Sequence, residues 1–96
     1  MSIEDNIKKL NIVLPVAKPP VGNYVATTFS GKLLFISGQI SIDENGQLIK
    51  GKLGKDLNTE AGYNAAKRCA LSIIAQVKKA CNNDLSKVKS CVKLTG

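Results

Sequence analysis

The first apolar pattern in the chain has helical spacing and is followed by a break. Ile3, Ile7 and Leu10 recur at intervals of three and four residues, which predicts a short helix over residues 3–10. Prolines at positions 15, 19 and 20 then exclude regular hydrogen-bonded structure. Residues 1–20 are therefore expected to form an N-terminal helix and a proline-rich arm that lies on the domain surface.

A much longer helix is predicted from about Thr59 to Ala80. Asn58 or Thr59 is the expected N-cap, and the helix dipole favours the negative charge of Glu60 in the first turn. Small and apolar residues recur along one stripe of this helix: Ala66, Cys69, Ala70, Ile73, Val77 and Ala80. The small side chains predict that this stripe packs closely on a sheet.

Extended patterns precede and follow the long helix. Residues 24–29 and 33–37 are rich in β-branched and aromatic residues, and a turn containing Gly31 separates them, which predicts a β-hairpin. The second run is apolar at four consecutive positions, which favours a strand buried on both faces. After a turn over residues 43–46, a short returning strand is expected at 47–50. Residues 88–95 alternate as a half-buried strand does.

These elements predict an α+β fold in one domain over residues 1–96. A hairpin, one helix and one further strand leave much of a sheet face uncovered. The C-terminal part of the fold is therefore expected to be absent, or to be supplied by other subunits. The unpaired strand edge favours association with another chain over a stable monomer.

The charge balance raises the possibility of a nucleic-acid partner. Fourteen Lys and Arg residues against seven Asp and Glu give a net charge of +7. However, the basic residues are spread over every segment and only Arg68 is an arginine. The four aromatic residues do not interleave with them as a stacking platform would. A solvated basic surface is the preferred interpretation.

Composition also restricts the chemistry. The chain has no histidine, no CxxC motif and no clustered carboxylates, so a metal site is not expected. No apolar run has the length of a membrane span, and the first residues do not have the pattern of a signal peptide. The three cysteines, at positions 69, 81 and 91, are expected to be free thiols in a reducing, cytoplasmic compartment.

The segment from Gly22 to Ile40 carries the most specific signal. A glycine shortly before Tyr24, a turn glycine before an apolar strand, and Ser37, Gly38 and Gln39 after it resemble the signature of the RidA/YjgF family. This family of reactive-intermediate deaminases is also called endoribonuclease L-PSP or translation initiation inhibitor. The long helix and residues 85–95 resemble the elements that follow in the family, and the N-terminal arm resembles that of its longer-chain branch.

The resemblance implies a chorismate-mutase-like fold assembled as a homotrimer, with ligand clefts between subunits. It implies hydrolysis of enamine and imine intermediates to 2-keto acids and ammonia, without a cofactor or a metal. By the same resemblance, Tyr24, Ser37 and Gly38 would bind the substrate, a small 2-imino acid. From the residues alone, Tyr24 and Ser37 could equally be strand residues, and Gly38 could belong to a bulge or turn.

The catalytic residues stay unassigned. The family's carboxylate-binding arginine and its late glutamate would lie beyond Gly96, and Arg68 does not match the arginine motif. Three functions are therefore open: a deaminase in truncated form, a non-catalytic module that binds a small metabolite, or a nucleic-acid-acting protein. No acid–base pair in the sequence supports the third.

Overall fold

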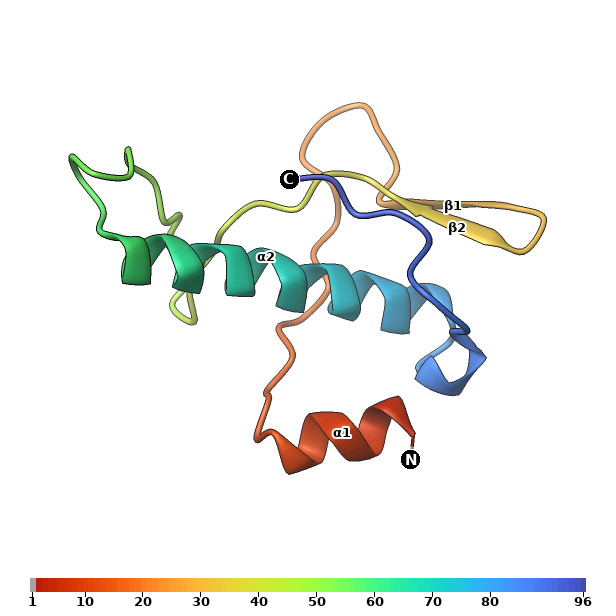
Figure 1. The fold of residues 1–96 in the computed structure, drawn as a ribbon. Helices are drawn as coiled ribbons and strands as arrows, with labels where there is room; N and C mark the ends of the chain where they lie inside the picture. Colours follow the sequence, from red (N-terminus) through yellow and green to blue (C-terminus); the bar gives the residue numbers. More distant parts are fainter. Residues whose placement is uncertain (1) are drawn as a thin grey trace.

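The computed structural model describes residues 2–96 and has an α+β fold, as predicted. Two helices, α1 (Ile3–Lys9) and α2 (Thr59–Ala80), lie with a hairpin of two strands, β1 (Thr27–Ser30) and β2 (Leu33–Ile36). A short 3-10 helix, η1 (Leu85–Lys87), follows α2. The long α2 runs across the whole molecule, with the hairpin above one end and α1 beneath it (Figure 1).

Helix α1 begins where a capping box predicts that it should. The Ser2 hydroxyl accepts from the backbone N–H of Asp5, and the Asp5 carboxylate accepts from the N–H of Ser2. The C-cap of the helix is Leu10, and Asn11 after it has a left-handed φ of 56°. Residues 11–26 form no regular element and cross α2 (Figure 1).

The hairpin is antiparallel, and Thr27 pairs with Ile36 and Ser30 with Leu33. Gly31, with φ 58°, occupies the first turn position, where a two-residue hairpin turn commonly needs glycine. The expectation that the second strand is buried on both faces is wrong. Phe35 is 57% exposed, because the sheet formed by the described residues has two strands and leaves that face uncovered.

Helix α2 has the predicted bounds, and its N-cap is Asn58, whose side chain accepts from the N–H of Ala61 at 2.8 Å. The buried face is not the predicted stripe. Leu71, Ala75 and Gln76 are buried, whereas Ala66 and Ala70 are exposed. The reason is that the arm and the segment after β2 pack against the opposite side of the helix from the alanines.

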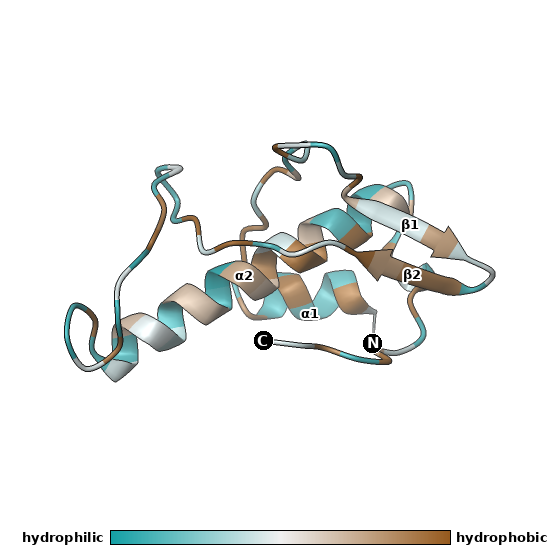
Figure 2. Cartoon of the chain, turned by 90° about the horizontal axis from the view of Figure 1, so that it is seen from above, coloured by the Kyte–Doolittle hydropathy of each residue, from teal (hydrophilic) through white to brown (hydrophobic). Residues whose placement is uncertain are grey.

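The small core gathers at the C-terminal half of α2. Its members are the buried apolar residues Leu71, Ala75, Cys81 and Leu85. The three cysteines are free thiols, with Cys81 buried and Cys91 exposed. Apolar surface extends well beyond this core and includes β2 (Figure 2).

The predicted returning strand at 47–50 is reduced to one bridge between Ile42 and Leu48. The turn before it is firmly built, because the Asp43 carboxylate accepts from the N–H groups of Asn45 and Gln47, both at 2.9 Å. Backbone hydrogen bonds hold this bridge on both sides, from the Ile49 N–H to the Ser41 carbonyl at 2.7 Å and from the Asp43 N–H to the Gln47 carbonyl at 2.9 Å.

The predicted strand at 88–95 does not form. Residues 88–96 have no regular secondary structure, and Val92 and Leu94 are exposed. A strand needs a neighbouring strand to pair its N–H and C=O groups. Among the described residues no strand takes that place, so the alternating pattern remains without its partner.

Candidate functional site

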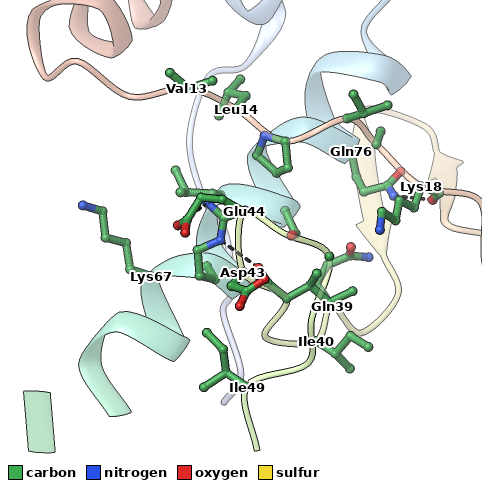
Figure 3. Close-up of a pocket in the computed structure, with 18 of the residues that line it drawn as sticks. Val13, Leu14, Lys18, Gln39, Ile40, Asp43, Glu44, Ile49, Lys67 and Gln76 are labelled. Atoms are coloured by element: carbon green, nitrogen blue, oxygen red, sulfur yellow. Dashed lines mark hydrogen bonds and ion pairs between the residues drawn. The ribbon is translucent and has the colours of Figure 1, made fainter. Parts of the chain in front are cut away.

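A cavity lies between the N-terminal arm, the segment after β2 and one face of α2 (Figure 3). Its volume is about 1230 Å3, and it is open to solvent. Mainly apolar side chains of the arm form one wall, polar and apolar residues of the 38–49 segment form another, and mainly polar side chains of α2 form the floor. A volume of this size exceeds what a small metabolite needs, so the cavity has room for further groups beside a ligand.

Tyr24, Ser37 and Gly38, the three residues singled out by the sequence, all line this cavity. Ser37 continues the hairpin pairing, because its N–H donates to the carbonyl of Ala26 at 2.9 Å. Its hydroxyl donates to the same carbonyl at 3.1 Å, so the hydroxyl oxygen remains able to accept a hydrogen bond. Tyr24 is about half exposed, with its ring against Gly22.

Gly38 leaves an open approach to the backbone. Its φ is outside the left-handed region, so the chain conformation does not require glycine there. A β-carbon at this position would have no heavy atom of the described residues within 4 Å. The absence of a side chain therefore keeps space free beside the main chain rather than relieving a contact within the protein.

Arg68 on α2 reaches the wall that follows β2. Its Nε donates to the carbonyl of Ile42 at 2.7 Å, and its guanidinium lies 3.6 Å from the Glu44 carboxylate. The Arg68 side chain is 15% exposed and that of Glu44 78%. The hydrogen bond is thus the well-formed contact, and the ion pair with an exposed partner contributes little.

Gln76 makes the matching contact with the other wall. Its side chain is buried, and Nε2 donates to the carbonyl of Lys18 at 2.9 Å (Figure 3). The proline-rich arm has no regular secondary structure, and this bond fixes it to α2. Arg68 and Gln76 therefore join both walls of the cavity to one helix.

The charged groups that line the cavity are few: Lys18, Lys67, Arg68, Asp43 and Glu44. Arg68 is largely buried and bound to the Ile42 carbonyl, so the two exposed lysines are the cations most accessible to an anionic ligand. Within residues 2–96, no group of three or more His, Cys, Asp or Glu side chains could hold a metal ion. The polar inventory suits recognition of a small polar molecule by hydroxyl, amide and backbone groups.

Sequence reasoning did not assign structural roles to Arg68 and Gln76. The available signal was a long polar residue on each side of Leu71, on a helix whose remaining buried positions are small or apolar. Such residues lie about two turns apart and share a face. Their partners are carbonyl groups of irregular segments, and no periodicity predicts those.

No helix among residues 2–96 combines the length and the apolar character that crossing a membrane requires.

Comparison with known proteins places the fold. Protein TCP17 of Trypanosoma cruzi is 40% identical over 89 residues, which are 93% of this chain and 55% of TCP17. The crystal structure of Atu1372 from Agrobacterium tumefaciens superposes with a TM-score of 0.72 and 41% identity, covering 88% of this chain and 49% of that one. A "putative endoribonuclease" from Shewanella oneidensis MR-1 gives a TM-score of 0.81 at 33% identity, covering 90% and 56%.

The chain thus spans about half the length of these relatives. The family model described as "YjgF/chorismate_mutase-like, putative endoribonuclease" matches residues 4–96. This match confirms the resemblance drawn from the segment between Gly22 and Ile40, and with it the chorismate-mutase-like fold. The chain belongs to the YjgF/chorismate mutase-like family.

Proposed function

We propose that this chain forms one wall of the active site of a RidA-like hydrolytic deaminase, which converts enamine and imine intermediates to 2-keto acids and ammonia. The observation that carries the proposal is the meeting of Tyr24, Ser37 and Gly38 at one cavity, beside an open stretch of backbone at Gly38. Family membership supports it at a coarser level.

The reaction suits a site without histidine. The enamine 2-aminoacrylate takes up a proton at its terminal carbon and becomes the iminium ion, whose C2 is electrophilic. Water adds to C2, the carbon–nitrogen bond then breaks, and pyruvate and ammonia leave. Because the carbon is already activated, the protein has to orient water and hold the substrate rather than generate a strong nucleophile.

Each of the three residues has a role that its geometry permits. The bare backbone at Gly38 lets the planar substrate lie against the main chain. The Ser37 hydroxyl group donates to the Ala26 carbonyl, and its oxygen accepts from an N–H of the substrate or from water. The Tyr24 hydroxyl, on a half-exposed ring at the cavity, donates to a substrate oxygen.

The substrate carboxylate needs a cationic partner. The family resemblance assigns that role to an arginine beyond Gly96, and this chain spans about half of its relatives. We propose that the remaining groups come from the other part of the family fold, in a homotrimer whose clefts lie between subunits. Exposed apolar residues of the hairpin, among them Phe29 and Phe35, offer surface for such contacts. The reaction would need no cofactor, and the free thiols suit the cytoplasm.

An ammonia-release assay tests the proposal. The 96-residue chain is added to 2-aminoacrylate as it is generated, and ammonia is followed against a sample without protein. Because this chain supplies one wall of the site and the substrate carbon is already activated, we expect slow release above the spontaneous rate, and a lower rate for Tyr24→Phe, which loses only the hydroxyl. A rate equal to the spontaneous one contradicts deaminase activity in this chain.

RNA cleavage is a second candidate, because both the family and the Shewanella relative are described as a "putative endoribonuclease". The net charge of +7 suits an anionic partner. Binding to a short RNA should then weaken steeply as salt increases, because phosphate contacts release counterions. Binding that is absent, or that does not change with salt, rules out this candidate.

A further inference from the structure

Two long polar side chains of α2 hold the cavity open in a defined shape. Arg68 donates to the Ile42 carbonyl on one wall, and Gln76 donates to the Lys18 carbonyl on the other. Both bonds join a helical side chain to the backbone of an irregular segment, 26 and 58 residues away in sequence. The helix is the rigid element, so these bonds set where each wall lies relative to it.

The wall held by Arg68 contains the residues of the proposed site. This segment runs from Ser37 to Ile42 and is tied at both of its ends. At the first end, Ser37 makes two hydrogen bonds to Ala26, and the Gln39 amide donates back to the Ser37 carbonyl at 3.1 Å. At the other end, Arg68 binds Ile42 at 2.7 Å. Gly38 lies between the two ties.

The contact is short and charge-assisted, and the arginine side chain is largely buried. Hydrogen bonds with an ionised donor are stronger than neutral ones. Glu44 is exposed and its carboxylate lies at 3.6 Å, so it adds little to the position of the wall. The carbonyl contact, rather than the ion pair, is what fixes Ile42.

We propose that Arg68 is a positioning residue for the ligand site. By holding the Ile42 carbonyl, it fixes the backbone of Gly38 at the distance from α2 that a bound substrate requires. Arg68 acts through the main chain and does not touch the substrate. This role rests on the proposed function of the Tyr24, Ser37 and Gly38 wall.

Backbone dynamics and ligand binding together test this role. The 15N order parameters of residues 38–42 are measured in the wild-type chain and in Arg68→Gln, Arg68→Lys, Glu44→Gln and Gln76→Leu. Pyruvate, the product of 2-aminoacrylate hydrolysis, serves as the binding probe. In the wild type we expect order parameters near the rigid value of about 0.85.

Arg68→Gln should lower the order parameters of residues 38–42 toward about 0.6 and weaken pyruvate binding about tenfold or more. Arg68→Lys keeps a charged donor and should recover part of both losses. Glu44→Gln should match the wild type. Gln76→Leu should loosen the arm around Lys18 and leave Gly38 ordered, so a general loss of stability can be recognised.

Unchanged order parameters and affinity in Arg68→Gln overturn the proposal, as does a Glu44→Gln variant that reproduces its losses. The two proposals fail in different ways. If wild-type chain does not bind pyruvate, the proposed function loses its support. If pyruvate binds and Arg68→Gln binds it equally well, only the role of Arg68 is refuted.

Discussion

The Glu4 carboxylate accepts a hydrogen bond from the backbone N–H of Leu85 at 2.9 Å and so joins α1 to η1, 81 residues apart. Leu85 is the most deeply buried side chain of the core, at 2% exposure. The first helix is thereby fixed to η1, which follows α2. The arm after α1 is held before its start by the Glu4 contact and at Lys18 by Gln76.

We therefore predict that Glu4→Ala lowers the free energy of unfolding by about 1–3 kcal/mol, because the Leu85 N–H is left without its acceptor. Glu4→Gln retains an acceptor oxygen and should lose less than half as much. Urea unfolding of the three proteins measures the difference. Equal stability of Glu4→Ala and the wild type would mean that α1 does not support η1.

Gly62 gives an opposite prediction. A β-carbon there would lie 2.5 Å from Cδ2 of Leu53, but Leu53 is 60% exposed and its side chain can turn away. Gly62→Ala should then stabilise the protein by about 0.5–1 kcal/mol through helix propensity.

A Leu53→Ala background provides the control for Gly62→Ala, because it removes the contact altogether. The gain measured by thermal unfolding should be at least as large there. If Gly62→Ala lowers the stability in both backgrounds, helix propensity does not determine the sign of the stability change.

The pH dependence of stability should carry a contribution from Asp84. The Ser86 side-chain hydrogen bond, followed by the Ser86 backbone N–H and the charge of Lys87, lowers the pKa of Asp84 below its ordinary value of 3.8. A carboxyl with a lowered pKa in the folded state stabilises the protein above its unfolded-state pKa. That contribution is lost as the pH falls through the folded-state pKa.

The stability difference between wild type and Asp84→Ala should accordingly be constant near neutral pH and shrink below about pH 4. Denaturant unfolding over this pH range measures it. Ser86→Ala, which removes the first cause of the lowered pKa, should move the decline to higher pH. A difference that grows as the solution is acidified contradicts this role of Asp84.

Local signals in the sequence were sufficient for α2 and the hairpin. Asn58 caps the helix through its own side chain, and Asn82, with φ 54°, ends it, so both ends are encoded within a few residues. Gly31 likewise encodes the hairpin turn. The bounds of α2 were therefore predictable, whereas the first strand of the hairpin was predicted over residues 24–29 and is observed as β1, Thr27–Ser30.

Patterns that depend on a distant partner did not predict the observed structure. The alternation over residues 88–95 and the apolar run of β2 both anticipate neighbouring strands that residues 2–96 do not supply. The alanine stripe of α2 also lacks its partner among residues 2–96, since Ala66 and Ala70 are exposed. Tyr24, Ser37 and Gly38 do line one cavity, and their role in binding a ligand stays a proposal.

Titration of Gly38→Val with pyruvate tests whether Gly38 keeps its backbone open for a ligand. A β-carbon there meets no described atom within 4 Å apart from its chain neighbours, and the φ of Gly38 is not left-handed, so thermal stability should change little. Gly96→Val, also at an open glycine, but not one that lines the cavity, is the matched control.

We predict that Gly38→Val binds pyruvate at least about tenfold more weakly than the wild type, whereas Gly96→Val binds it as the wild type does. Wild-type affinity in a folded Gly38→Val protein would contradict the claim.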